Sequence, residues 1–226
     1  MKYSRIVKGI FISRPNRFIA NVEIDGQVHV VHVKNTGRCK ELLIEGATVL
    51  LEEGKNPERK TKYDLVAVYK GDMLVNMDSQ VPNDVVYEWL CEGNLFSKSA
   101  KIKREFTYGK SRFDLYVEDG ERRAFIEVKG VTLERDGIAS FPDAPTERGV
   151  KHLLHLMECV KDGYEAYIFF VVQMKGPCAF VPNDITHKEF GHTLRLCREN
   201  GVNILCYDSI VTEDSIKISD PVSILI

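Results

Sequence analysis

Two acidic side chains and a lysine lie on successive strand-like segments in the second half of the chain. Asp114 falls within the stretch 111–117, and Glu127 and Lys129 fall within 124–131. Because side chains alternate along a strand, Glu127 and Lys129 point to the same face of the sheet. Carboxylates held close together repel each other, and a hard divalent cation relieves this repulsion through oxygen ligands. We therefore expect Asp114 and Glu127 to bind Mg²⁺ or Mn²⁺, with Lys129 beside them.

The turn between these two segments decides how Asp114 faces Glu127. A two-residue loop that begins at Asp119 would place Asp114 opposite Phe125 and diagonal to Glu127. A four-residue loop that runs on to Arg122 would place Asp114 directly opposite Glu127. In both registers the two acids and the lysine share one face. The other face then carries the apolar residues, which we expect to pack against a helix: Phe113, Leu115, Val117, Ile126 and Val128.

This set of side chains suits the hydrolysis of a phosphodiester. A bound divalent cation lowers the pKa of water and polarises the phosphodiester, and the ammonium group of Lys129 can orient the water or stabilise developing negative charge. The predicted catalytic residues are Asp114, Glu127 and Lys129, and Glu105 on the preceding strand is a candidate additional acid. The alternative interpretation is a surface hairpin whose charges form ion pairs that stabilise little.

Basic residues that could hold a phosphate backbone lie in three parts of the chain. The stretch 98–112 contains six lysines or arginines and the single acid Glu105. A helix that we expect to be capped by Thr146 brings further basic residues to its N-terminus, where phosphate groups bind well. The arginines of the first domain could bind a single strand of nucleic acid. The predicted nucleic-acid-binding residues are Arg14, Arg17, Arg38, Lys103, Arg104, Arg112, Arg148 and Lys151.

The elements that position these residues form two regions. Residues 1–82 contain short alternating stretches and an Asp25-Gly26 hairpin signal, which predict a small OB-like or SH3-like β-barrel. Residues 83–226 alternate helix-spaced and strand-spaced apolar residues, which predicts a mixed α/β domain. We expect the first helix of this domain to be capped by Asn83 or Asp84. The predicted fold is therefore α/β as a whole, with an N-terminal barrel.

The composition is that of a globular protein. The chain has 226 residues, of which 44% are hydrophobic and 28% are charged, with a net charge of −2. This composition excludes a disordered or collagen-like chain, and no apolar run approaches the roughly 18–20 residues that a membrane span needs. The first residues show no signal-peptide core, so we expect a cytoplasmic protein that does not bind membranes. The six cysteines lack the spacing of zinc ligands and are expected to be reduced and mostly buried.

Several longer motifs resemble the sugar fermentation stimulation protein family. In the second domain they are Ser111-Arg112-Phe113-Asp114, Ile126-Glu127-Val128-Lys129, Phe141-Pro142-Asp143-Ala144, Thr146-Glu147-Arg148-Gly149 and Lys151-His152, and in the first domain Arg17-Phe18-Ile19-Ala20 and Asn35-Thr36-Gly37. The resemblance implies an OB-fold domain followed by a restriction-endonuclease-like domain of the PD-(D/E)XK group. It also implies DNA binding without marked sequence preference and a role in regulating sugar-utilisation genes. By motif match, Asp114, Glu127 and Lys129 correspond to the metal-binding acids and the catalytic lysine of that nuclease group.

Two functions of different classes follow from these features, and a metal-dependent hydrolase of a smaller phosphodiester is a third option. The first is a metal-dependent phosphodiesterase, a nuclease that acts on DNA or on RNA. The second is a non-catalytic DNA-binding regulator of sugar-metabolism genes that keeps the nuclease fold for binding alone. An intact set of two acids and a lysine favours the nuclease, because a protein that only binds phosphates gains little from carboxylates that face them.

Overall fold

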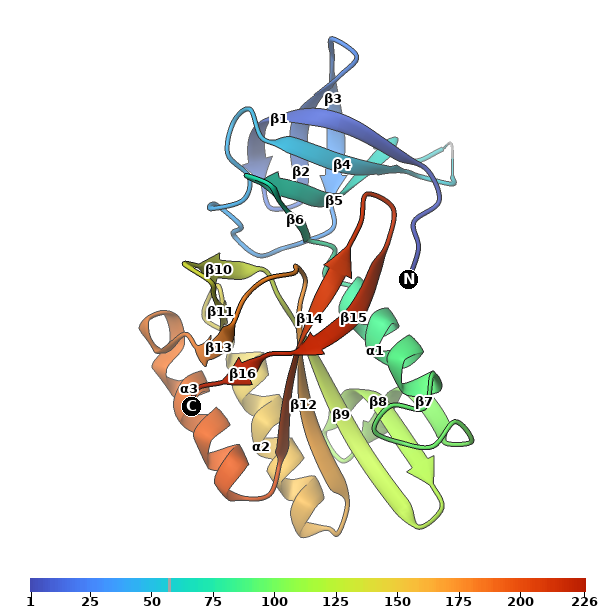
Figure 1. The fold of residues 1–226 in the computed structure, drawn as a ribbon, viewed down its shortest axis with the longest axis vertical. Helices are drawn as coiled ribbons and strands as arrows, with labels where there is room; N and C mark the ends of the chain where they lie inside the picture. Colours follow the sequence, from blue (N-terminus) through green and yellow to red (C-terminus); the bar gives the residue numbers. More distant parts are fainter. Residues whose placement is uncertain (57) are drawn as a thin grey trace.

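The first third of the chain closes into a small barrel. The computed structural model describes residues 1–56 and 58–226. In the first sheet the strand order is β3-β2-β1-β4-β5-β6, and a parallel pairing between β3 and β5 closes the barrel in the OB-like manner (Figure 1). The strands are β1 (Ile6–Asn16), β2 (Ile19–Ile24), β3 (Gln27–Val33), β4 (Thr48–Glu53), β5 (Tyr63–Lys70) and β6 (Met73–Asn76). Ile24 pairs with Gln27, so the predicted Asp25-Gly26 hairpin turn is confirmed.

The rest of the chain forms a mixed α/β domain around a twisted sheet. The strand order of this sheet is β15-β14-β12-β9-β8-β7, with β9, β12 and β14 parallel to one another. The elements of the sheet and its helices are α1 (Val81–Cys91), β7 (Lys101–Tyr108), β8 (Ser111–Asp119), β9 (Arg122–Val131), α2 (Glu147–Lys161), β12 (Glu165–Val172), α3 (Asp184–Glu199), β14 (Asn203–Val211) and β15 (Ile216–Pro221). A smaller sheet lies beside it, with the order β10 (Leu133–Arg135), β11 (Ile138–Phe141), β13 (Ala179–Pro182) and β16 (Ser223–Ile224).

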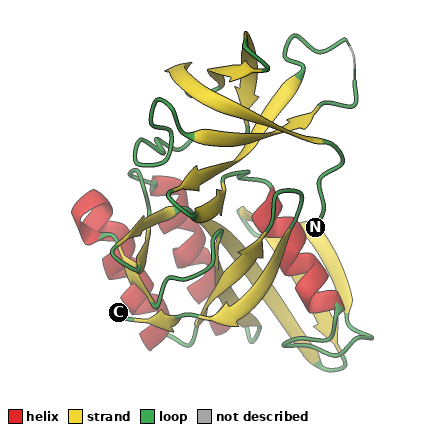
Figure 2. Ribbon diagram, turned by 45° about the horizontal axis from the view of Figure 1, so that its top comes forward, coloured by secondary structure: helices red, strands yellow, loops and turns green. Residues whose placement is uncertain are grey.

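Helices cover both faces of the larger sheet. Figures 1 and 2 show α2 and α3 together on one face and α1 on the other. Strand β12 is buried along almost its whole length because it is central in the sheet and covered on both sides. Within the described ranges 1–56 and 58–226, no helix combines the length and the hydrophobicity that crossing a bilayer requires.

Two apolar cores continue from the mixed domain into the barrel. The core under α2 and α3 includes Phe125 and Phe170 and extends to barrel residues such as Val31. The core under α1 includes Ile126 and extends to barrel residues such as Val66. Because apolar surface from both domains is buried in each core, the barrel packs firmly against the mixed domain.

The N-cap of α2 is the expected residue, and the N-cap of α1 is not. Thr146 caps α2 as predicted and accepts a hydrogen bond from Gly149 N–H at 3.1 Å. Helix α1 begins earlier than expected, with Gln80 at the N-cap and Pro82 in its first turn, so neither Asn83 nor Asp84 is its cap. Proline suits this position because the first N–H groups of a helix have no partner within it. The expected domain boundary between residues 82 and 83 therefore falls inside the first turn of α1.

The alternation of β8 breaks at Asp114. We expected Phe113 to share a face with Leu115, but Phe113 packs on Phe125 in the core under α2, with ring centroids 5.0 Å apart. Leu115 lies in the other core, under α1. The irregularity coincides with Glu105 on the neighbouring strand, whose φ of +54° is unusual for a residue other than glycine. The local backbone, and not simple alternation, therefore sets the direction of the side chains around Asp114.

The cysteines follow the expectation. All six are free, and they divide into a buried group and an exposed pair. The buried thiols are Cys39, Cys159, Cys197 and Cys206, and the exposed ones are Cys91 and Cys178.

Candidate functional site

The candidate site lies where β8 and β9 separate. The backbone pairing of these strands ends with Leu115 opposite Ile126. Beyond this point the side chain of Asp114 replaces the missing strand partner, because its Oδ2 accepts a hydrogen bond from Val128 N–H at 2.8 Å. The observed register is the one that continues to Asp114 opposite Glu127. The four-residue loop expected for this register is wrong, because Asp119 pairs with Arg122 and the turn consists of Gly120 and Glu121. The two carboxylates are thus brought to the same gap between the strands.

Helix α1 holds the other oxygen of Asp114. Asn83 Nδ2 donates a hydrogen bond to Asp114 Oδ1 at 2.8 Å. Hydrogen bonds from a helix and from a strand fix the carboxylate from two directions, so its rotamer is set before any ligand arrives. Each oxygen keeps acceptor capacity, since an ionised carboxylate offers about four lone-pair sites.

Glu127 is the buried acid of the site. Only 1% of it is exposed, in the middle of β9 between β8 and β12. Its Oε1 accepts from Lys129 Nζ and also contacts Nδ1 of His152 on α2. Its Oε2 is buried and has no hydrogen-bond partner among the residues that the structure describes. Buried polar atoms are nearly always paired, and this oxygen has the capacity to accept a further partner.

The surroundings shift the pKa values of the two acids in opposite directions. Burial, and then the negative charge of Glu127, raise the pKa of Asp114 above its ordinary value, although Lys129 opposes the shift. Burial also acts to raise the pKa of Glu127, but the positive charge of Lys129 and the contact with His152 outweigh it and lower that pKa. Glu127 is therefore held ionised, and its negative charge makes ionisation of Asp114 less favourable.

The donor set of this site fits a hard divalent cation. Across residues 1–56 and 58–226, no three His, Cys, Asp or Glu side chains converge in a way that would hold a metal ion. At this site the protein offers two carboxylates, those of Asp114 and Glu127. This ligand set is suited to Mg²⁺, which usually keeps several waters and binds one or two carboxylates together with substrate phosphates. The unpartnered Oε2 of Glu127 is the atom that such a cation would satisfy.

Glu105, the candidate additional acid, does not join this pair. Its carboxylate is exposed and lies 3.4 Å from the guanidinium of Arg112. The left-handed backbone conformation of Glu105 accompanies this outward position. The acids at the site are therefore Asp114 and Glu127.

Acids balance the basic stretch on β7 and β8. Arg104 pairs with Asp84 of α1, and Arg112 pairs with Glu105. Lys103 Nζ lies 3.9 Å from Glu118 and 5.5 Å from the centre of the Phe106 ring. The stretch is thus less cationic than its sequence indicated, because helix α1 and strand β8 supply the missing negative charge.

Arg14 supports a loop of the barrel. Its two terminal nitrogens donate to four backbone carbonyl groups at distances of 2.6–2.9 Å. Those carbonyls belong to Arg17, Asn35, Gly37 and Arg38. Since all four terminal N–H groups are used, Arg14 holds the loop over residues 35–38 in place and has no terminal donor left for a phosphate.

Four of the predicted nucleic-acid-binding residues are exposed cations without an ion-pair partner among the described residues. Arg17 and Arg38 on the barrel, and Arg148 and Lys151 at the start of α2, are exposed and form no ion pair with any described residue. Arg148 Nε lies 3.4 Å from His152 Nε2, so Arg148 reaches the residue that contacts Glu127. The free charge of α2 is therefore adjacent to the acidic pair.

Two residues of the site were missing from the sequence prediction. Asn83 was taken for a helix cap, and the sequence around it carries no signal for its bond to Asp114. His152 was not among the predicted site residues, yet it lies among the buried residues of α2 and contacts Glu127. Its spacing from Gly149, Leu153 and Leu156 matches the buried face of the helix, and this pattern could have indicated a buried histidine.

Comparison with known proteins gives a consistent result along the chain. Residues 12–77 match the family model "SfsA N-terminal OB domain", and residues 80–215 match "Sugar fermentation stimulation protein RE domain". A sugar fermentation stimulation protein homolog of Clostridium beijerinckii is 60% identical over 100% of both chains, and one of Desulfitobacterium hafniense is 58% identical over 99% of this chain and 98% of its own. A solved structure, described as that of Pyrococcus furiosus SfsA in complex with Ca²⁺, is 26% identical, covers 100% of this chain and 98% of its own, and superposes with a TM-score of 0.87. The chain therefore belongs to the sugar fermentation stimulation protein family.

Proposed function

We propose that this protein binds DNA and hydrolyses its phosphodiester bonds at a divalent-cation site formed by Asp114 and Glu127. The observation that carries the proposal is the acid pair itself: two carboxylates at one gap between strands, with Oε2 of the buried Glu127 left without a partner among the described residues. A purely structural role would favour full pairing of this oxygen, because an unsatisfied buried acceptor costs about 1–3 kcal/mol.

The cation would be Mg²⁺ or Mn²⁺. Asp114 and Glu127 would hold it through oxygen atoms, which both ions prefer. The related Pyrococcus furiosus protein was solved in complex with Ca²⁺, another cation that prefers oxygen ligands. When bound, the cation would supply Lewis-acid polarisation of the phosphodiester and a lower pKa for water.

The residues of the chain would position the substrate around this pair. Arg148 and Lys151 would hold the phosphate next to the scissile bond, at the N-terminal end of α2, where the helix dipole also favours negative charge. Lys129, only partly exposed beside Glu127, would orient the attacking water or stabilise the negative charge that develops on the phosphoryl group. Asp114 and Glu127 need no rearrangement, because hydrogen bonds from α1, α2 and β9 already fix them.

The barrel would extend the contact with nucleic acid. Arg17 and Arg38 are exposed cations on one side of the barrel, and the guanidinium of Arg17 lies 5.1 Å from the centre of the exposed Phe18 ring. A positive charge next to an aromatic ring suits a single strand, which binds through its phosphates and by stacking of its bases. We propose DNA as the partner, with RNA as the alternative.

A non-catalytic DNA-binding regulator of sugar-metabolism genes is the second candidate. The ammonium group of Lys129 already balances the charge of Glu127, and His152 contacts the same carboxylate oxygen, so the two acids can stay in place without a cation. In that case the same exposed cations would bind the DNA backbone, and the acids would only shape the gap between β8 and β9.

Cleavage assays separate these two functions. The protein is incubated with single- and double-stranded DNA and RNA, with Mg²⁺, with Mn²⁺ and with EDTA, and an Asp114→Ala variant is run alongside. Cleavage that requires the cation and is lost in the variant supports the nuclease. Binding without cleavage under every condition supports the regulator, and cleavage that survives the substitution rejects the assigned site.

A further inference from the structure

A cleft opens between the barrel and the mixed domain, directly after the candidate site in the chain. Its volume is about 290 Å³, and Gly130, which follows Lys129, is one of its lining residues. The barrel contributes Thr36 and Gly37, and the mixed domain contributes Asp143 and Gln173. This volume is at the lower end of the range for small-ligand pockets, so the cleft can take one flat heterocycle but no double helix.

A buried polar network gives the side chain of Gln173 a defined direction. Gln173 is 1% exposed, and its Nε2 donates to Asn76 Oδ1 at 2.9 Å and to the carbonyl oxygen of Asp78 at 3.0 Å. Both partners are acceptors in this arrangement, because Asn76 Nδ2 donates to Tyr3 Oη at 2.8 Å. The amide nitrogen of Gln173 must therefore point into the network, and its Oε1 points toward Gly130.

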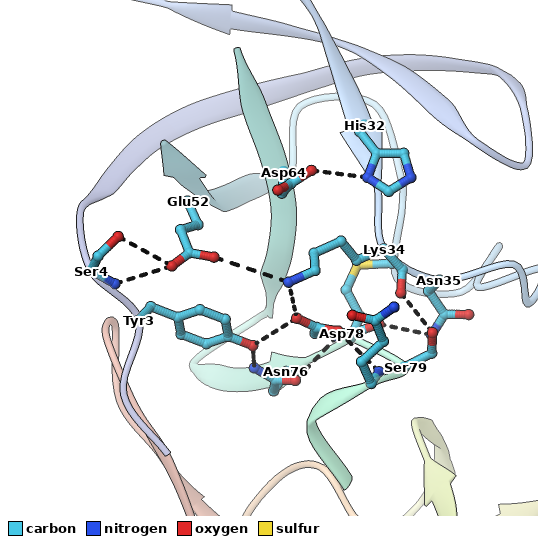
Figure 3. A network of polar contacts seen from close by, with 12 residues as sticks. Tyr3, Ser4, His32, Lys34, Asn35, Glu52, Asp64, Asn76, Asp78 and Ser79 are labelled. Carbon is cyan, nitrogen blue, oxygen red and sulfur yellow. Dashed lines mark hydrogen bonds and ion pairs between the residues drawn. The ribbon is translucent and has the colours of Figure 1, made fainter. Parts of the chain in front are cut away.

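The side chains of Tyr3, Lys34 and Asp78 extend this network and keep it in place. Figure 3 shows Tyr3, Asn76 and Asp78 joined together, with the ammonium group of Lys34 on the carboxylate of Asp78. Lys34 Nζ lies 2.7 Å from Asp78 Oδ2, and the side chain of Asp78 is fully buried. A buried, satisfied network of this kind is rigid, so the direction of Gln173 does not depend on a ligand.

The cleft presents acceptors and no cation. No described residue donates to Gln173 Oε1 or to Asp143 Oδ1, whereas Asp143 Oδ2 accepts from Arg38 N–H at 3.1 Å. Among the described residues that line the cleft, Asp143 is the only charged one. A phosphate would meet no lysine or arginine among the described lining residues, but a group with N–H donors would meet two acceptors with free capacity.

We propose that this cleft binds one unpaired nucleobase that carries an exocyclic amino group. The inference rests on the proposed function and names its substrate class: a nucleic acid with at least one base out of the duplex. Watson–Crick pairing engages one hydrogen of each amino group, and a duplex is too wide to enter a cleft of about 290 Å³. Only a single-stranded or flipped base can therefore offer its amino group to Gln173 and Asp143 inside the cleft. The neighbouring cations Arg38 and Arg148 would hold the flanking phosphates, which places the bound base beside the Asp114–Glu127 pair.

Binding without metal tests this proposal separately from cleavage. Fluorescence anisotropy measures the affinity of the full chain, in EDTA, for short oligomers of deoxycytidine and of thymidine of equal length. Both bases are pyrimidines, but only cytosine has an amino group, and thymine has a carbonyl oxygen at that position and an added 5-methyl group. We expect the cytidine oligomer to bind about tenfold more tightly, the factor that one hydrogen bond of about 1.4 kcal/mol provides.

Three variants assign the preference to the cleft. Asp143→Asn keeps an oxygen for Arg38 N–H but places a donor where the amino group would bind, so the preference for cytidine should disappear. Thr36→Leu enlarges an exposed loop residue that lines the cleft and should weaken cytidine binding to the thymidine level. Thr107→Leu changes an exposed threonine on β7, outside the cleft, and should leave the preference unchanged.

The outcomes distinguish failure of this inference from failure of the proposed function. Equal affinity for both oligomers, with no effect of the cleft variants, would overturn the base pocket and leave phosphate-backbone binding intact. A cytidine preference that survives both Asp143→Asn and Thr36→Leu would also overturn the assignment to this cleft. Binding of neither oligomer would overturn the nucleic-acid function together with the pocket.

Discussion

Val128 N–H donates a hydrogen bond of 2.8 Å to the carboxylate of Asp114, at the point where β8 and β9 stop pairing. This bond anchors Asp114 to the backbone between Glu127 and Lys129, the two residues with which it would act. The side chain of Asp114 on β8 thereby occupies a backbone hydrogen-bonding position of β9. The two carboxylates are therefore held together in the free protein, and their mutual repulsion is already present before a cation binds.

Asp114→Asn should abolish stabilisation by a divalent cation. At a Mn²⁺ concentration about a hundredfold above its Kd, the wild-type free energy of unfolding should rise by about 2.7 kcal/mol. The variant should lose nearly all of this gain, because it removes one of the two carboxylates. Without the cation its stability should be close to that of the wild type, since the lost charge also removes the repulsion with Glu127. Denaturant unfolding with and without Mn²⁺ measures both effects, and Asp214→Asn, at an exposed ion pair with Lys2, is the control.

His152 should act as a positioning residue for Glu127. His152→Leu removes the contact with Oε1, so the carboxylate should be less well oriented and the Kd for Mn²⁺ should rise about 10–100-fold. His152→Asn keeps an N–H donor near the position of Nδ1 and should restore much of the affinity. Calorimetric titration with Mn²⁺ measures the change, and His192→Leu on the exposed side of α3 serves as the control. Equal losses in the Leu and Asn variants would show that His152 matters only for packing.

The free cations of α2 should set the salt dependence of DNA binding. Arg148→Gln and Lys151→Gln should each weaken binding and reduce the slope of log Kobs against log salt concentration by about 0.9, the value for one phosphate contact on B-DNA. Arg104→Gln should change the slope little, because Asp84 already neutralises Arg104. Affinities measured over a range of salt concentrations test this ranking, and an equal loss for Arg104→Gln would contradict it.

Tyr3 should make the protein sensitive to alkaline pH. Burial, and then the negative charge of Asp78, raise the pKa of the Tyr3 hydroxyl far above its ordinary value of 10.0. In the unfolded chain this hydroxyl ionises near pH 10, while in the folded protein it stays protonated. Unfolding therefore releases a proton above that pH, and the free energy of unfolding should fall by up to about 1.4 kcal/mol for each further pH unit.

The variant Tyr3→Phe isolates this contribution. It leaves Asn76 Nδ2 without its acceptor and should cost about 1–3 kcal/mol at neutral pH. Between about pH 10 and pH 11 its stability should fall less steeply than that of the wild type. Urea unfolding over this range measures the two slopes, and parallel slopes would mean that Tyr3 ionises in the folded protein. Tyr69→Phe, at a surface bond to Glu213, is the comparison variant.

Local sequence patterns predicted the main elements but not the small ones. The hairpin at Asp25-Gly26, the cap at Thr146 and the buried strand β12 are each specified within a few residues, by turn chemistry, capping or a continuous apolar run. Strands β1 and β15 and the short strands β6, β10, β11, β13 and β16 were not predicted. Strands of two to four residues show no measurable periodicity, and their pairing partners lie far along the chain.

At the candidate site, too, local patterns predicted some contacts and missed those that depend on packing between distant elements. Alternation along β9 places Glu127 and Lys129 together, and the two residues are in contact. The bond from Asn83 to Asp114 and the pairing of Arg104 with Asp84 depend on how α1 packs against β7 and β8, which no local pattern contains. Arg14 was expected to bind nucleic acid because it is an arginine in a barrel, whereas the loop over residues 35–38 uses all its terminal donors.

Crystals soaked in Mn²⁺ and measured at its absorption edge would test the central claim most directly. The account predicts an anomalous peak between the carboxylates of Asp114 and Glu127, with Oε2 of Glu127 among the ligands. Well-ordered crystals in which both carboxylates keep their protein contacts and no peak lies between them at saturating Mn²⁺ would contradict it.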